Sequence, residues 1–242
     1  MTLRRPALAA LALLTLPVGP LHAGGLRVMP VRIDVPQDKR HCALTISNDT
    51  ARPVSIQVRG FGWSMDASGS ETLDPDTGPV INPAIFTLAQ GKSQLVRCSL
   101  PALRGRNEGS WRLILDELPS EEAAQPGTIR SVLRISIPVF RTPAKARPQL
   151  DWQKSGNEAD GSRIILRNTG TRHVRIAALD PRIDGGANGH SVLPAFGYLL
   201  AGSAWTLRVA APLLSDGDTL RITTEDGASE VAAPARPGSP AS

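Results

Sequence analysis

Residues 129 to 140 read Ile129-Arg130-Ser131-Val132-Leu133-Arg134-Ile135-Ser136-Ile137-Pro138-Val139-Phe140, and this stretch decides the fold class. Apolar side chains recur at every second position, and polar ones such as Arg134 and Ser136 lie between them. A period of two places successive side chains on opposite faces of a β-strand. Ser131 interrupts the apolar face, and Val132 and Phe140 interrupt the polarity of the other. We therefore predict a β-strand here.

This strand is longer than the roughly five or six residues that are usual in a sheet. The polar segment before it, Pro119 to Gly127, would leave its first half as a free edge. An exposed alternating edge promotes aggregation unless pairing with a partner is its purpose. We expect either a strand offered to another chain or an ordinary strand whose apolar face lies in its own core.

Working outward, the other apolar stretches are short, alternate with polar residues and end at turn residues. Before residue 129 they occupy positions 26–28, 31–35, 43–47, 54–63, 86–88, 93–100 and 111–115. The pattern breaks at 141–148, where two prolines indicate a linker. A second series follows at 150–153, 163–167, 174–176, 203–209 and 219–223. Such spacing is typical of β-sandwiches, so we predict an all-β chain with two of them in tandem.

We place the first domain at residues 24–143 and the second at 144–231, followed by a disordered tail at 232–242 that is rich in Ala, Pro, Gly and Ser. Each domain contains a strand that ends in Asn and a turn. These are Ile46-Ser47-Asn48-Asp49 and Leu166-Arg167-Asn168-Thr169-Gly170. The shared feature suggests that the two sandwiches are similar.

The first residues resemble an export signal. Arg4 and Arg5 precede an uncharged apolar run from Ala7 to Val18, and Ala23 offers a small residue for cleavage. We expect a signal peptide at residues 1–23 and a protein outside the cytoplasm. No later segment reaches the length of a membrane-spanning helix, so we expect no insertion into a membrane.

Composition and motifs exclude several classes. The chain has 242 residues and a formal charge of +5, but its basic residues are dispersed, without the basic stripe and interleaved aromatics that nucleic-acid binding needs. Common catalytic, metal and cofactor motifs are missing, so we expect no enzyme, metal or cofactor. Asp76-Thr77-Gly78 matches the aspartic-protease tripeptide, but flanking prolines favour a turn. His41, His173 and His190 lie far apart in the sequence, and we expect them at the surface.

Cys42 and Cys98 each share strand parity with apolar neighbours, so both should point inward. In an exported protein they form either a disulfide or two buried thiols, and the oxidising compartment favours the bridge. The strands that hold them would be the second and fifth, which are neighbours in one sheet of an immunoglobulin-like sandwich.

Four segments in this order resemble the PapD-like periplasmic chaperones of the chaperone-usher pilus pathway. They are 43–49, 83–97, 111–119 and 137–140. Phe61-Gly62-Trp63-Ser64 together with Pro138 is similar to the archaic branch of that family. The resemblance implies two immunoglobulin-like sandwiches arranged as a boomerang. It also implies a chaperone that lends a strand to pilin or fimbrial subunits and delivers them to an outer-membrane usher.

The resemblance assigns roles to residues of this sequence. The donor-strand positions correspond to Ile129, Ser131, Leu133, Ile135 and Ile137. The arginine that grips the subunit's terminal carboxylate corresponds to Arg32, and the lysine position falls on Pro138, which cannot bind a carboxylate. We expect Arg112 on the neighbouring strand to replace it, or else to be an ordinary solvated strand residue.

An ionic cluster that fixes the domain angle in the family would comprise Glu108, Arg141 and Asp226. The main alternative function is an extracellular structural or adhesive subunit that receives a strand instead of donating one. Such a subunit usually carries its own alternating extension, whereas only Gly24 to Met29 would precede the first strand here.

Overall fold

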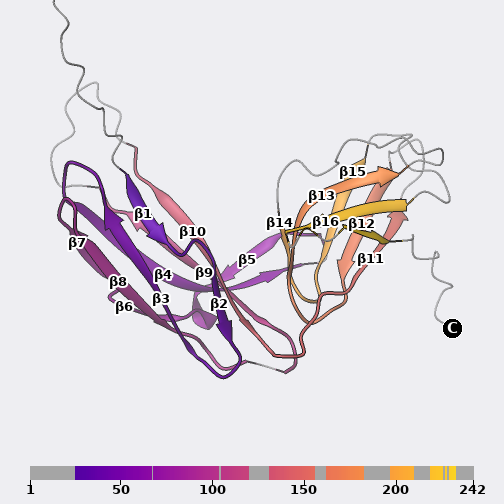
Figure 1. The fold of residues 1–242 in the computed structure, drawn as a ribbon, viewed down its shortest axis with the longest axis horizontal. Coiled ribbons are helices and arrows are strands. Elements are labelled where there is room, and N and C mark those ends of the chain that lie inside the picture. Colours follow the sequence, from indigo (N-terminus) through magenta and orange to yellow (C-terminus); the bar gives the residue numbers. More distant parts are fainter. Residues whose placement is uncertain are drawn as a thin grey trace, which may run out of the picture.

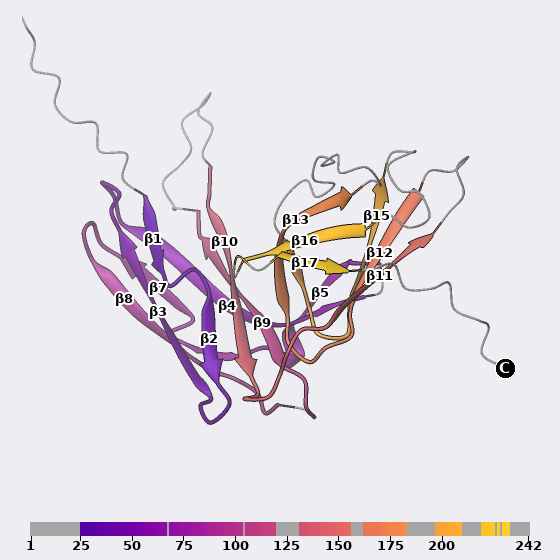
Figure 2. The same cartoon turned by 45° about the vertical axis from the view of Figure 1, so that its right-hand side comes forward.

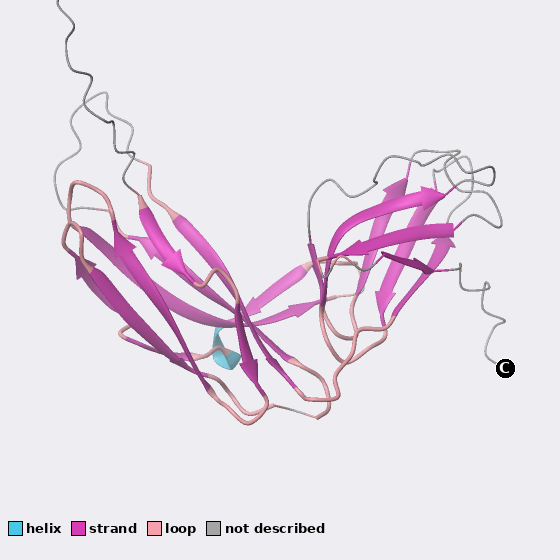
Figure 3. Cartoon of the chain, viewed as in Figure 1, coloured by secondary structure: helices cyan, strands magenta, loops and turns pink. Residues whose placement is uncertain are grey.

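The computed structural model describes residues 25–66, 68–103, 105–119, 131–155, 162–182, 197–209, 219–225, 227 and 229–232. They form two β-sandwich arms that meet at an angle, with the first domain in indigo to magenta and the second in orange to yellow (Figure 1). Strands dominate both arms, and a short 3-10 helix, η1 (Pro75–Thr77), is the one helix within the described ranges (Figure 3). The prediction of an all-β chain with two tandem sandwiches is confirmed.

Two sheets build the first domain. One has the order β1 (Leu26–Met29), β3 (His41–Asn48), β8 (Ser93–Ser99) and β6 (Val80–Asn82). The other has the order β2 (Ile33–Pro36), β10 (Arg134–Thr142), β9 (Gly109–Glu117), β4 (Val54–Met65) and β5 (Glu71–Asp74), and β7 (Ile85–Leu88) also pairs with β4. The inward side chains of both sheets, including Leu44, Ile56 and Leu113, form one core.

The second domain is also a sandwich of two sheets. One has the order β11 (Leu150–Ser155), β12 (Ser162–Asn168) and β15 (Ala204–Val209). The other has the order β14 (Gly197–Leu199), β13 (Val174–Arg182), β16 (Thr219–Thr224) and β17 (Ser229–Ala232). Trp152, Leu166 and Ile222 lie in its separate core.

Cys42 and Cys98 face each other across the β3–β8 pair, and the structure joins them by a disulfide. Their Cα atoms are 5.0 Å apart, within the range that disulfides require. The bridge therefore lies inside one sheet of the first domain.

Each domain has a buried Asn at the end of a strand, and its side-chain amide binds the carbonyls of two other segments. We call this arrangement an asparagine clasp. The amide of Asn48 donates to the carbonyls of Arg52 at 2.8 Å and Leu88 at 3.0 Å. Asn168 repeats this arrangement in the second domain, donating to the carbonyls of Arg172 at 2.7 Å and Leu199 at 3.1 Å. Each donates to the residue four positions ahead, so the similar sequence segments fold in the same way.

The strand predicted at 129–140 is observed as β10, at 134–142. Ile129 lies outside the described residues, and 131–133 are described without strand structure. Phe140, which breaks the alternation, points away from the first-domain core. It belongs instead to a cluster with Trp63 and Leu200 that connects the two arms.

The hairpin formed by β4 and β5 extends from the first domain to the second, where Figure 2 shows β5 next to the second-domain strands. Met65 at its tip packs against the second-domain core. Gly69 has a φ of 90°, and a Cβ atom there would lie 2.9 Å from the indole of Trp205. The position therefore needs glycine both for its backbone conformation and for its close approach.

Candidate functional site

The first half of β10 has an open edge, which we define as the side of residues 134–138 that faces away from β9. On this side β2 pairs with β10 only from Val139 to Thr142. β1, which precedes β2, pairs with β3 in the other sheet. Within the described ranges, no strand therefore covers 134–138 on this side.

The register indicates which backbone groups face the open edge. The amide of Glu117 donates to the carbonyl of Leu133 at 2.9 Å, so residues 133, 135 and 137 have their backbone groups turned toward β9. Because antiparallel pairs alternate, the groups of Arg134 and Ser136 point to the open edge. Pro138 also points there but has no N–H to offer.

The apolar side chains near this edge differ in accessibility. Leu133 is 42% exposed, whereas Ile135 is half-buried and packs against the core. Both line a small apolar recess together with Leu26 and Val28 of β1. Ile137 is only 1% exposed, so its side chain belongs to the first-domain core, contrary to the donor role expected for it. Ser131 is exposed and precedes the strand.

Two arginines flank the end of the open edge. Pro138 pairs with Arg112 of β9. Arg32 directly precedes Ile33, which pairs with Val139, so Arg32 lies beside Pro138 on its other side. Strand alternation turns both arginines away from the first-domain core. The proline at the expected lysine position thus lies between two arginine residues across the sheet.

Arg112 is held in a defined orientation. Its guanidinium lies 3.7 Å from the ring centroid of Trp63 and 5.9 Å from that of Tyr198. Its Nη2 donates to the two carboxylate oxygens of Glu71 at 3.2 and 3.4 Å. Burial lowers the pKa of Arg112, and the charge of Glu71 partly offsets this effect. Arg112 is therefore not a solvated strand residue, and its bond to Glu71 shows that it can bind a carboxylate.

Arg32 contacts carboxylates of both domains. Its Nε donates to Asp34 at 2.9 Å, and its Nη1 donates to Glu225 of the second domain. Glu225 in turn lies 3.5 Å from Arg175. Burial disfavours the charged form of Arg32, but the hydrogen bond to Glu225 and the charge of Asp34 outweigh it and raise its pKa.

The ionic cluster expected from Glu108, Arg141 and Asp226 differs from the contacts observed. Glu108 accepts hydrogen bonds from the backbone N–H of His173 at 2.8 Å and from the hydroxyl of Thr142, and its carboxylate lies 2.6 Å from His173 Nδ1. Arg141 donates instead to the carbonyl of Gln37 at 2.7 Å. Asp226 lies outside the described residues.

Strand parity explains the difference. Thr142 and Phe140 share one face of β10, and Arg141 lies on the other. The residue that faces Glu108 is therefore Thr142, one position after the predicted Arg141. His173, expected at the surface, has a side chain only 2% exposed and stacks on Phe140. Its flanking residues gave no signal of this, because its partners come from the other domain.

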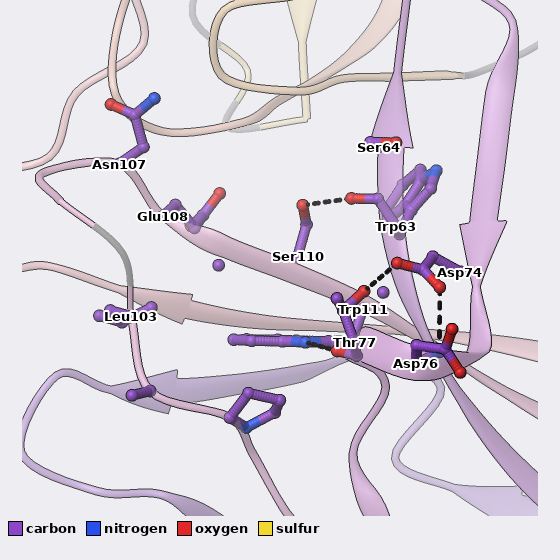
Figure 4. Close-up of a pocket in the computed structure, with 14 residues that line it drawn as sticks. Trp63, Ser64, Asp74, Asp76, Thr77, Leu103, Asn107, Glu108, Ser110 and Trp111 are labelled. Atoms are coloured by element: carbon purple, nitrogen blue, oxygen red, sulfur yellow. Dashed lines mark hydrogen bonds between the residues drawn. The ribbon is translucent and has the colours of Figure 1, made fainter.

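A pocket of about 460 Å³ lies between the β4–β5 hairpin and residues 101–110 (Figure 4). Several of its polar groups bond to one another. Asp74 accepts from the N–H of Asp76 and from the hydroxyl of Thr77, both at 2.9 Å, and Trp111 donates to the Thr77 carbonyl at 3.1 Å. Asp76-Thr77-Gly78 is thus part of the η1 turn. Among the described residues, no group of His, Cys, Asp or Glu is arranged to hold a metal ion, and no helix could cross a membrane.

Comparison with solved structures supports the fold. One similar structure is the CsuC-CsuE chaperone-tip adhesion subunit pre-assembly complex from archaic chaperone-usher Csu pili of Acinetobacter baumannii. It is 22% identical over 86% of this chain and 96% of that chain, with a TM-score of 0.67. The Pseudomonas aeruginosa CupB2 chaperone is 16% identical over 85% and 97%, with a TM-score of 0.55. The Salmonella enterica SafA pilin in complex with the SafB chaperone gives 15% over 86% and 94%, with a TM-score of 0.59.

These structures share two tandem immunoglobulin-like sandwiches with this chain, so that prediction is confirmed. The comparison with curated proteins finds no significant match. A family model described as "Pili and flagellar-assembly chaperone, PapD N-terminal domain" matches residues 25–147. That family consists of assembly chaperones and is not an enzyme family. Because the match spans more than half of the sequence, the chain belongs to the family of pili and flagellar-assembly chaperones that carry the PapD N-terminal domain.

Proposed function

We propose that this chain is a periplasmic chaperone that stabilises pilin or fimbrial subunits by lending them a strand and delivers them to an outer-membrane usher. Residues 1–23, the expected signal peptide, lie outside the described residues, so the periplasmic location follows from the family and from the sequence pattern. The similarity to the Csu chaperone supports a place in the archaic branch.

The open edge of β10 is the observation that carries this proposal. It offers the backbone groups of Arg134 and Ser136, and the side chain of Leu133 is already exposed. An added strand would gain main-chain hydrogen bonds and a pocket for alternate side chains, as in other cases of strand addition. Burying one large apolar side chain contributes about 1.5 to 3 kcal/mol.

β2 limits how far an added strand can extend along β10. β2 runs parallel to β10 and pairs with this side of it from Val139 onward. An added strand on the same side therefore ends next to Arg32, the residue before β2. A strand that also runs parallel to β10 would bring its terminal carboxylate to Arg32, with Arg112 across Pro138. Guanidinium groups bind carboxylates by charge-assisted hydrogen bonds.

Co-expression with pilin subunits of the same organism tests the proposal. A tagged chain is expected to copurify with a subunit that is degraded when expressed alone. Arg32→Ala and Arg112→Ala should each weaken the complex by roughly 1.5 to 3 kcal/mol, the scale of a lost charge-assisted bond. Arg97→Ala, which removes an exposed arginine of β8 in the other sheet of the first domain, is the matched control. A subunit bound equally well by all four proteins would show that the anchor lies elsewhere.

A further inference from the structure

Arg32 of the first domain is already bound to a carboxylate in the free protein. Its Nη1 donates to Oε1 of Glu225, a residue 193 positions away in the second domain. Both side chains are mostly shielded from solvent, with 33% of Arg32 and 22% of Glu225 exposed. Shielding of this kind strengthens an ion pair relative to one at the open surface.

The same guanidinium is the group that a strand on the open edge would reach with its C-terminal end. Nε of Arg32 is used by Asp34 and Nη1 by Glu225. A third carboxylate would therefore meet two negative charges around one positive charge. Like charges at this distance repel, so the arriving carboxylate binds Arg32 more favourably when one of them leaves.

Glu225 has a second cation beside it, Arg175 of its own domain. Its Oε2 lies 3.5 Å from Nη1 of Arg175. Its backbone N–H also donates to the carbonyl of Arg175 at 3.0 Å, so the two residues stay adjacent within the second domain. Glu225 can thus leave Arg32 and still have a positive partner, whereas Asp34 is only two positions from Arg32 in the chain and stays beside it.

We propose that Glu225 occupies the anchor Arg32 in the free protein and is displaced by the C-terminal carboxylate of the bound subunit strand. This inference rests on the proposed strand donation. It makes Glu225 a competing internal ligand that weakens binding of the terminal carboxylate. It also couples binding to the domain arrangement, because displacement breaks a contact between the two arms.

Two short peptides of alternating Ile and Thr, identical except for a free C-terminal carboxylate or a C-terminal amide, are the probes. Their Kd is measured with wild-type protein, Glu225→Gln and Asp49→Asn. Asp49 is a matched control because its carboxylate also pairs with an arginine, Arg27 of β1, in the other sheet of the first domain. Glu225→Gln is expected to bind the free-acid peptide roughly three- to tenfold more tightly than wild type. It should bind the amide peptide unchanged, and Asp49→Asn should match wild type with both.

Equal affinity of wild type and Glu225→Gln for the free-acid peptide would overturn the inference and leave strand donation intact. If neither peptide binds the wild type, strand donation itself fails and the inference falls with it. A second measurement avoids the variant altogether. In wild-type protein, the carboxyl ¹³C signal of Glu225 should shift on adding the free-acid peptide but not the amide peptide. A signal that both peptides leave unchanged contradicts displacement.

Discussion

The ring of Phe140, on the last strand of the first domain, stacks on His173 of the second domain. Their centroids are 3.6 Å apart and their planes are inclined by 13°. Phe140 is fully buried, and Trp63 and Tyr198 complete the cluster around it. Glu108 fixes the other side of His173. This aromatic contact joins the two arms where the family resemblance implied an ionic cluster.

Phe140→Ala should therefore lower the free energy of unfolding by about 3 to 5 kcal/mol, as for other buried aromatics. It should also widen the range of angles between the arms, since the contact between the domains is lost. Chemical denaturation and small-angle X-ray scattering measure the two effects. Phe61→Ala, which removes a half-buried ring that contacts Arg59, is the control and should leave the angle unchanged. An unaltered scattering curve for Phe140→Ala would show that other contacts set the angle.

The two asparagine clasps give a second prediction. Asn48→Ala and Asn168→Ala should each destabilise by about 1 to 3 kcal/mol, because each change removes two hydrogen bonds to backbone carbonyls, one of them buried. Separate probes for each domain, such as hydrogen exchange, should locate the loss in the domain that carries the change. Asn107→Ala, at an exposed loop position, should have little effect. A loss spread evenly over both domains would contradict independent clasps.

The disulfide between Cys42 and Cys98 closes a loop with a sequence separation of 56. By the chain-entropy estimate such a bridge contributes about 4 kcal/mol to stability. Intact mass with and without reductant should differ by two hydrogens in protein from an oxidising compartment. Two cysteines that alkylate fully after denaturation, without reductant, would show that the bridge does not form.

How far the sequence alone predicts this structure depends on where each side chain's partner lies. The alternation at 129–140 predicted the strand that is observed at 134–142, because strand period is a local property. Phe140 broke the alternation, and the reason is a second core shared with the other domain. The apolar residue at an outward position thus indicated a contact outside the first-domain core, but not the residues of the second domain that make it.

Contacts between domains were the part that sequence reasoning missed. Arg32 could be chosen as an anchor from the resemblance, but its bond to Glu225 joins residues 193 positions apart. Thr142 replaced Arg141 beside Glu108 because one residue of offset turns a side chain to the opposite face of a strand. Ile137 fits the alternation of a donor strand, yet its side chain is buried in the core of the first domain. Periodicity gives the face of a residue and does not show what covers that face.

The backbone at the open edge can be tested directly. Ser136→Pro removes an N–H that faces the open edge and is not used to pair with β9, so the fold should be kept. The same change should weaken subunit binding, since a main-chain hydrogen bond to the added strand is lost. Unfolding midpoints and copurification with a subunit provide the two readouts. Ser136→Ala, which keeps the N–H, is the control and should bind as wild type does. Equal binding by both variants would show that this N–H does not pair with the subunit.

Strand donation is tested most directly by placing a charge at Leu133 and measuring recovery of a subunit complex. Leu95, on the other sheet of the first domain, is a matched control because it is 40% exposed and Leu133 is 42% exposed. Leu133→Glu and Leu95→Glu should unfold at the same denaturant concentration as the wild type, since neither side chain is in the core. Wild type and Leu95→Glu should then copurify with the subunit and protect it from proteolysis, and Leu133→Glu should do neither. If Leu133→Glu recovers and protects the subunit as well as Leu95→Glu does, this segment of the chain does not donate the strand.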